Sequence, residues 1–310
     1  MSGDQLSEVF DLIEVRGLLS GGFAVRGPWV SRGVIRDSLK LLAVVSGRVR
    51  LMTDGLDRPI DLAPGDVAVL NSRSWVELRG GTGDGPPVEL VPEEIDPGAA
   101  LVGADLDVDD IVLGGRVDIN DAGRALLLQA LPPVGHVRGT AASATALGTS
   151  LDRLFDEVSG NRIGSAFAIR QYCQLVLLEV VRAYLDQAAL PPGWLRALAD
   201  DRLRPVLALM HAEPGRHWGL DELARAAAMS RTSFAERFRT VAGVPPVAYL
   251  NRLRMMLAQR ALRDDDARVG SLAAELGYSS DSAFSTAFKR EVGESPLRYR
   301  YRVREEASAR

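Results

Sequence analysis

The sequence predicts an α+β multidomain fold in which an N-terminal β-barrel or jelly roll precedes a helical connector and an all-α C-terminal domain. Three observations support this. Apolar runs broken by Gly, Pro and Asp occupy residues 10–91, amphipathic helical patterns follow, and one helical motif occurs twice near the C-terminus. We expect boundaries at 1–138, 139–195 and 200–303 for the three parts. A chain of 310 residues is long enough for separate hydrophobic cores.

The N-terminal region has the pattern of short strands joined by tight turns. Two runs, at 40–53 and 58–71, are rich in β-branched residues. Between the strand halves of the second run, residues 63–66 read Ala-Pro-Gly-Asp, which is a turn signal because Pro presets φ and Gly accepts positive φ. The Gly-rich stretch 80–87 predicts a loop tip. Such spacing predicts a small barrel or jelly roll, with further strands within 99–113 and 117–120 and a short helix at 121–133.

Two helical patterns follow the β region, at 144–159 and 165–186. In the second, apolar side chains recur at three- and four-residue steps and share one face of the helix: Ile169, Cys173, Val176, Leu177, Val180 and Tyr184. This stripe has to be buried, either within its own domain or against a second copy of the chain. We expect the connector to contribute to a homodimer. The prolines at 191–192 stop the preceding helix and mark a hinge.

A helix-turn-helix pattern occurs twice between residues 220 and 299. Leu223 and Met229 recur as Leu272 and Tyr278, 49 positions later. After one inserted residue at the turn, a second set recurs 50 positions later: Phe234, Phe238, Gly243, Pro246 and Tyr249 match Phe284, Phe288, Gly293, Pro296 and Tyr299. One such pattern is weak because αα-hairpins are common, but two with the same spacing are specific. The motif is one that places a recognition helix in the major groove of DNA.

The second helix of each motif has an inner and an outer face. Phe234 and Phe238 anchor the first in the core, and Ser230 is a good N-cap. In the second motif Ser279 or Ser280 is the cap. The outward positions that we expect to read bases are Thr232, Ala235, Glu236, Asp281, Ser282, Ser285 and Thr286. Hydroxyls bond to base edges, carboxylates accept from cytosine N4, and small methyl groups pack on the thymine methyl.

Basic residues around these helices are expected to contact DNA phosphates. They are Arg231, Arg237, Arg239, Arg252, Arg254, Lys289 and Arg290. For each arginine, a solvated surface charge or a pair with an acid is the alternative. The net charge of the chain is −4, but residues 201–310 carry a net +5 and the remainder a net −9. An acidic first part and a basic second part fit a regulatory domain joined to a DNA-binding domain.

An apolar stripe predicts one long helix between the two motifs. Its residues are Val247, Leu250, Leu253, Leu257 and Ala261, and three aspartates at 264–266 end it. A single helix would fix the distance and rotation between the recognition helices.

On these residues the sequence resembles the AraC/XylS family of bacterial transcription regulators. The resemblance covers about 203–302 and is carried by residues 243–250, Leu276-Gly277-Tyr278, Phe284 through Arg290, Gly293 through Pro296, and Tyr299-Arg300. It implies a domain of seven helices that reads two adjacent major-groove segments with its third and sixth helices, here 231–241 and 281–291. The protein would act as an activator or a repressor.

The N-terminal region is similar to the cupin-type sensor domains in one branch of that family. The similarity rests on residues 62–66, the strand runs before them, and Leu131-Pro132-Pro133. Cupin enzymes hold a metal through histidines, whereas none of the histidines here, His136, His211 and His217, lies within 10–91. We therefore expect no metal, no cofactor and no enzymatic activity. The domain would hold a small organic effector or serve as a dimerisation scaffold. Trp29 and Trp75 are pocket candidates, with the barrel core as the alternative.

Other features limit the function classes. The single cysteine, Cys173, excludes an intramolecular disulfide and lies in an apolar helical context, which favours a buried hydrophobe over a reactive thiol. No apolar run approaches 18 residues and the N-terminus lacks a basic signal region, so we expect a cytoplasmic protein. The expected partners are double-stranded DNA, an effector, RNA polymerase and a second copy. The alternatives are helix-turn-helix motifs that bind protein, and a metal-free cupin scaffold without effector.

Overall fold

The computed structural model describes residues 4–13, 15–91, 101–140, 145–160, 162–186, 190–264 and 267–308. Its internal contacts divide the chain into two compact units. The helical unit comprises Met1–Glu14, Asn120–Ala130 and Pro191–Arg310, and the sheet unit comprises Val15–Ile119 and Leu131–Leu190. The predicted fold class, an N-terminal barrel or jelly roll, a helical connector and an all-α C-terminal domain, is confirmed, and the β region has the form of a two-sheet sandwich. The domain boundaries given above stay a prediction.

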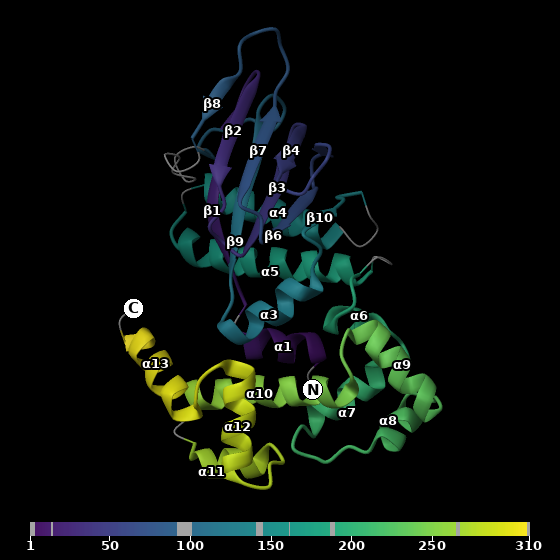
Figure 1. Cartoon of the computed structure of the whole chain (residues 1–310). Coiled ribbons are helices and arrows are strands. Elements are labelled where there is room, and N and C mark those ends of the chain that lie inside the picture. The colour runs from purple at the N-terminus through teal and green to yellow at the C-terminus, as the bar shows by residue number, and fades with distance from the viewer. Residues whose placement is uncertain are drawn as a thin grey trace. The chain divides into compact units, whose positions relative to one another are not determined.

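The sheet unit is a sandwich of two sheets with five described strands each (Figure 1). One sheet is antiparallel throughout and contains, in spatial order, β1 (Arg16–Val25), β9 (Asp110–Asp118), β3 (Leu39–Ser46), β6 (Val67–Asn71) and β10 (Val134–Val137). The other contains β5 (Ile60–Leu62), β4 (Val49–Thr53), β7 (Trp75–Gly80), β2 (Trp29–Val34) and β8 (Val88–Leu90), of which only β8 runs parallel to its neighbour. Strand neighbours that are far apart in sequence are typical of the jelly-roll class.

Apolar side chains fill the space between the two sheets. They include Phe23, Leu42, Val44, Leu51, Leu70, Leu78 and Val112. Trp29 lies among them, 1% exposed, with its ring edge-to-face on Phe23 at a centroid distance of 5.0 Å. Its Nε1–H donates to Asp110 Oδ2 at 2.7 Å, which satisfies the indole. Of the two alternatives for Trp29, the structure therefore supports the core.

Helices α4 (Thr145–Ser159) and α5 (Ser165–Leu185) lie against the sheet that contains β1 and β3 (Figure 1). The predicted stripe of α5 is buried from Cys173 to Tyr184 within this unit. Gly17 of β1 permits the close approach, because a Cβ there would lie 2.5 Å from the Cys173 carbonyl oxygen. Burial raises the pKa of the Cys173 thiol to about 11, which keeps it protonated. The stripe is thus covered without a second copy of the chain.

The helical unit is built from ten described helices. They are α1 (Gln5–Ile13), α3 (Asp121–Ala130), α6 (Trp194–Ala199), α7 (Arg204–Ala212), α8 (Leu220–Ala226), α9 (Arg231–Ala242), α10 (Pro246–Asp264), α11 (Val269–Glu275), α12 (Asp281–Val292) and α13 (Pro296–Ser308). Counted from α7, the third is α9 and the sixth is α12, as the resemblance implies. α1 and α3 come from the N-terminal part of the sequence but contact each other and α10.

His211 joins α1 to the helices of the first helix-turn-helix motif. Its Nδ1 lies 3.2 Å from Glu8 Oε2 and its Nε2 lies 2.8 Å from the Tyr249 hydroxyl. The His211 side chain is 2% exposed, and this burial lowers its pKa from 6.5 to about 4. The imidazole is therefore neutral at pH 7, with Nδ1–H donating to Glu8 and Nε2 accepting from Tyr249.

We expect the neutral His211 to make the helical unit lose stability as the pH falls from about 6.5 to 4. In that window the unfolded chain binds a proton that the folded chain does not, so protonation favours unfolding. The shift of the pKa to about 4 corresponds to about 3 kcal/mol. Glu8, whose pKa is raised by burial, acts in the opposite direction. Hydrogen exchange of α7 and α10 amides at several pH values measures the effect. His211→Gln should remove it, and an unchanged pH dependence in that variant would contradict the assignment.

Candidate nucleic-acid interface

The two helices predicted to read DNA, α9 and α12, begin and end in the same way. Ser230 caps α9 by accepting the Ser233 backbone N–H at 3.2 Å, and Ser280 caps α12 by accepting that of Ala283 at 3.1 Å. Of the two serines predicted as alternatives for the second cap, Ser280 holds the position. Each helix ends at a glycine with positive φ, Gly243 at +73° and Gly293 at +92°. Equal caps at both ends give the two helices equal lengths.

Each of these two helices is anchored by a chain of three aromatic rings. In the first motif Phe234 packs on Phe238 and Phe238 on Tyr249, at centroid distances of 5.7 and 5.8 Å. In the second motif Phe284, Phe288 and Tyr299 repeat this at 5.8 and 5.6 Å. All four phenylalanines are fully buried, so the helix faces opposite them point outward.

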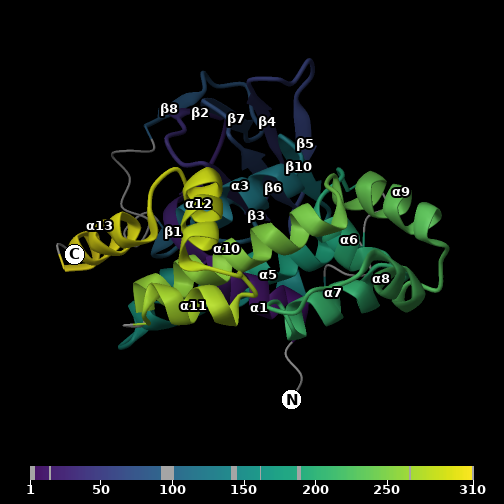
Figure 2. The same cartoon turned by 60° about the horizontal axis from the view of Figure 1, so that its bottom comes forward.

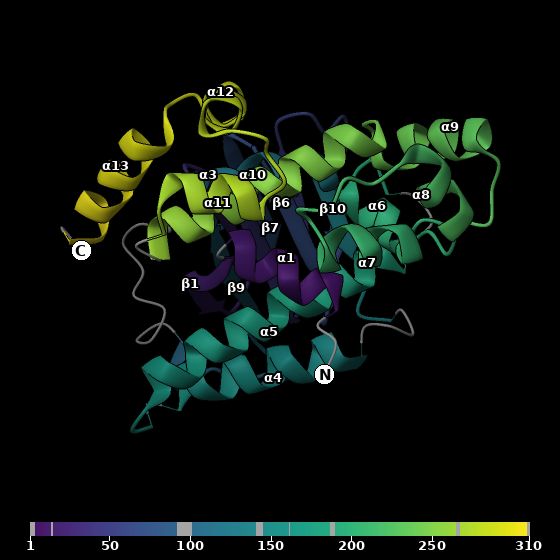
Figure 3. The same cartoon turned by 90° about the horizontal axis from the view of Figure 1, so that it is seen from below.

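The predicted base-reading residues lie on those outward faces. Five are exposed, namely Thr232, Glu236, Asp281, Ser282 and Thr286, and two are half-buried, Ala235 and Ser285. α10 connects the two motifs, with α9 near one end and α11–α12 near the other (Figure 2). Seen from below, α9 and α12 lie along the same side of the helical unit (Figure 3). The structure therefore brings the predicted residues to two separate helix faces at the two ends of α10.

The predicted phosphate-binding cations differ in their surroundings. Arg239, Arg252 and Lys289 are exposed, and no carboxylate in the described part of the chain lies within ion-pair distance of them. Arg231 and Arg290 are exposed and lie 3.5 and 3.6 Å from Asp221 and Glu291. Such exposed pairs contribute little and exchange readily.

Arg237 is held more firmly than the other surface arginines. Two of its guanidinium nitrogens, Nε and NH2, bond to the Asp200 carboxylate at 3.3 and 2.7 Å. The Asp200 side chain is only 9% exposed and also accepts the backbone N–H groups of Arg202 and Leu203. The pair fixes α9 against the start of α7, so Arg237 has a positioning role whether or not it also reaches a phosphate.

The structure corrects the prediction that Arg254 contacts a DNA phosphate. It is 8% exposed, with Nε donating to the Pro214 carbonyl at 2.6 Å and NH2 to the Arg216 carbonyl at 3.0 Å. Its side chain therefore holds the loop between α7 and α8. That loop in turn touches the second motif, because a Cβ on Gly277 would lie 2.0 Å from the Gly215 carbonyl oxygen. The sequence contains a signal for this burial, because Arg254 lies four residues after Leu250 and therefore on the same inner face of α10.

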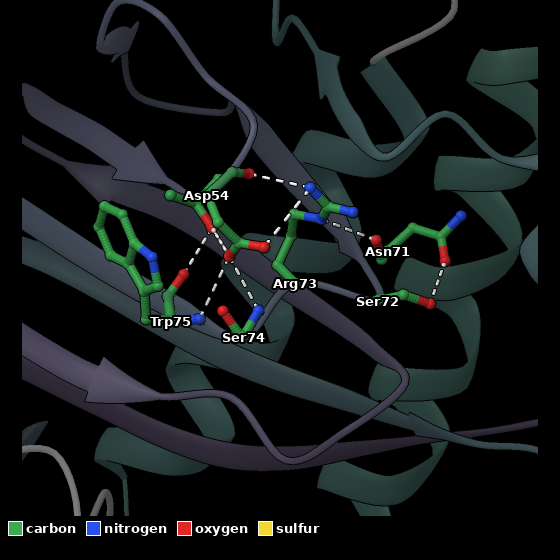
Figure 4. Close-up of polar contacts among 7 residues, drawn as sticks. Asp54, Asn71, Ser72, Arg73, Ser74 and Trp75 are labelled. Carbon is green, nitrogen blue, oxygen red and sulfur yellow. Dashed lines mark hydrogen bonds and ion pairs between the residues drawn. The ribbon is translucent and has the colours of Figure 1, made fainter.

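Trp75, the second pocket candidate, does not meet Trp29. On the β2–β7 ladder Trp29 pairs with Gly80 and Trp75 pairs with Val34, so the two rings belong to opposite ends. Trp75 is 39% exposed. Its backbone belongs to a turn organised by Asp54, whose carboxylate accepts the Ser74 N–H at 2.9 Å (Figure 4). Those hydrogen bonds lower the pKa of Asp54. This cluster stabilises a turn and forms no ligand pocket with Trp29.

Two further kinds of feature are absent from the residues that the structure describes. No group of three or more His, Cys, Asp or Glu side chains there could hold a metal ion. In the same residues, no helix is long and apolar enough to cross a membrane.

Comparisons with known proteins match both parts of the chain. A family model described as Cupin matches residues 4–186, and one described as Helix-turn-helix domain matches 223–302. A putative AraC-like transcription regulator of Streptomyces lividans is 34% identical over 300 residues, which is 96% of this chain and 98% of that protein. Another, of Streptomyces antibioticus, is 35% identical over 302 residues, with the same shares covered. The solved DNA-binding domain of AdpA in complex with a target DNA is 34% identical and covers 34% of this chain and 96% of its own, with a TM-score of 0.33.

Proposed function

Since the chain belongs to the AraC-like transcription regulators, DNA-binding proteins with a cupin region and a C-terminal helix-turn-helix domain, we propose that it reads its operator with α9 and α12 in adjacent major-groove segments. Its relatives are transcription regulators rather than enzymes. The observation that carries the proposal is the repeated aromatic anchor, which turns an equivalent polar face outward on each helix. Recognition helices that read one duplex face lie about 34 Å apart, one helical turn of DNA.

We assign a role in DNA binding to each predicted residue from the exposure of its side chain. Thr232, Glu236, Ser282 and Thr286 would reach base edges, with Ala235, Asp281 and Ser285 beside them. The exposed basic residues of the predicted set would contact phosphates, and these contacts would supply much of the affinity and its salt dependence; they are Arg231, Arg237, Arg239, Arg252, Lys289 and Arg290. Arg254 is left out of this set because its guanidinium is already bonded to two carbonyls.

A randomised operator library tests these roles on the full chain. Thr232→Ala with Ser282→Ala should change the preferred bases in both half-sites. Arg239→Ala with Lys289→Ala should weaken binding to all sequences alike and reduce the slope of log K against log salt by about two. Arg260→Ala, an exposed arginine of α10 outside both sets, is the control. The groove assignment fails if the first double variant selects the same bases as the wild type.

The regulatory part of the function is also a proposal. We place the control of operator binding in the cupin region, through an effector or through dimerisation, with RNA polymerase as a further partner in the cytoplasm. The filled space between the sheets argues against an effector site beside Trp29. Exposed Ile163, Phe167 and Leu175 provide an apolar surface for a second copy near α5. Sedimentation of the full chain with and without operator DNA tests this, and a mass of one 33.4 kDa chain in both samples would argue against the dimer.

A further inference from the structure

A cavity of about 110 Å³ lies inside the helical unit where α9 ends and α10 begins. Its lining residues are Gln129 of α3, Pro192, Gly193 and Trp194 at the start of α6, Ala242, Gly243 and Val244 at the end of α9, and Tyr249, Arg252 and Met256 on α10. A protein cavity of about 150 Å³ can hold a benzene ring. This cavity is smaller but open on one side, so a short alkyl chain or part of a single ring would fit inside it, with the polar end of the ligand at its opening.

Most of the cavity wall is apolar. Trp194, Ala242 and Met256 are each less than 9% exposed and present hydrocarbon or ring surface. Tyr249 contributes its ring only, because its hydroxyl is already bonded to His211 Nε2 at 2.8 Å. A mostly apolar wall favours an apolar group over a sugar or a nucleotide, whose polar atoms would lose their hydrogen bonds to water.

Arg252 is the charged residue among those lining the cavity. Its neighbours on the same helix, Arg260 and Arg263, both lie near Asp264, whereas no carboxylate of the described residues lies within ion-pair distance of Arg252. Two of the carbonyl groups at the end of α9, a helix end that would repel an anion, already accept hydrogen bonds. Arg239 O accepts the Gly243 N–H at 3.0 Å and Val241 O accepts the Gly193 N–H at 2.9 Å. A guanidinium with free donors beside an apolar wall matches a carboxylate on a hydrocarbon group.

We propose that this cavity binds a small monocarboxylate that carries one aromatic ring or a short alkyl chain. The carboxylate would bond to the guanidinium of Arg252, and the hydrocarbon part would pack between Trp194, Ala242 and Met256. The site lies in the helical unit and goes beyond the proposed control through the cupin region. It depends neither on that control nor on the groove assignment.

Calorimetric titration of the full chain with benzoate and with hexanoate tests the proposal. Ligands of this size reach dissociation constants of about 0.1–10 mM in a fitting site. Benzamide, which has the shape of benzoate without its charge, should bind at least tenfold more weakly. Arg252→Gln should weaken benzoate binding about ten- to a hundredfold, because it removes a charge-assisted hydrogen bond. Arg260→Gln, on the same helix but outside the cavity, should leave benzoate binding unchanged.

A second pair of variants tests the apolar wall. Ala242→Leu should fill part of the cavity and weaken both acids, and Val244→Phe is the substitute should Ala242→Leu fail to fold by circular dichroism. The proposal is overturned if neither acid binds at about 10 mM, or if Arg252→Gln and the filled variant bind benzoate as the wild type does. Operator binding is measured separately on the same samples, so failure of the proposed function would be distinguished from failure of this site.

Discussion

Phe284→Ala should lower the local stability of the second helix-turn-helix motif by about 3–5 kcal/mol, the cost of removing a fully buried phenylalanine side chain. Phe284 has no exposed surface and packs on Tyr278 and Phe288 at centroid distances of 5.5 and 5.8 Å. Its loss would remove the contact that fixes α12 in the core. Hydrogen exchange of the α12 amides measures the local opening free energy without assuming that the whole chain unfolds in one step.

The matched control is Phe284→Leu, which keeps most of the buried volume and should cost clearly less. The equivalent variant of the first motif, Phe234→Ala, should expose the amides of α9 and leave those of α12 protected. Protection of α12 that is equal in the wild type and in Phe284→Ala would contradict the central place of this ring.

Arg254→Ala is expected to have the second large effect, a loss of about 3–5 kcal/mol in the stability of the helical unit. The side chain makes two charge-assisted hydrogen bonds, each with a contribution of about 1.5–3 kcal/mol, and its removal strands the carbonyls of Pro214 and Arg216. Arg254→Lys should not restore them both, because an ammonium group lacks the planar fork that spans two acceptors. Exchange of the amides in α8 and α10 reports the loss.

Salt dependence separates this role from a phosphate contact. Arg254→Ala should weaken operator binding by loosening the loop that touches Gly277, without changing the slope of log K against log salt. Arg239→Ala should reduce that slope by about one while leaving amide exchange as it is. A reduced slope for Arg254→Ala would return this residue to the phosphate set.

Repeated local patterns made much of the C-terminal part predictable. The spacing of Phe234 and Phe238, repeated at Phe284 and Phe288, defines which face of α9 and of α12 is buried. Serine caps and terminal glycines define where those helices begin and end. These signals involve residues within one or two helical turns of each other, so they can be recognised in the sequence without the tertiary structure. The stripe of α5 and the buried Cys173 were predictable for the same reason.

Less was predictable wherever a side chain meets elements that are distant in the sequence. The sequence is compatible with Trp29 in a pocket or in the core. The structure places it in the core, where its ring packs on Phe23 and its indole N–H donates to Asp110. The expectation of a dimer rested on the apolar stripe of α5. The structure shows that the chain's own sheet covers this stripe, so the stripe does not require a second copy.

The sequence alone determined the fold class, the paired helix-turn-helix motifs and the family, because short-range periodicity and capping encode them. The tertiary structure decided that Arg254 supports a loop, that α1 and α3 pack with the helical unit, and that a cavity forms beside Arg252. The physical reason is that burial and hydrogen bonding depend on the neighbours that folding brings together. Arg252 and Arg254 illustrate this, because they lie two residues apart on α10. The side chain of Arg252 is exposed, whereas the guanidinium of Arg254 bonds to two backbone carbonyls.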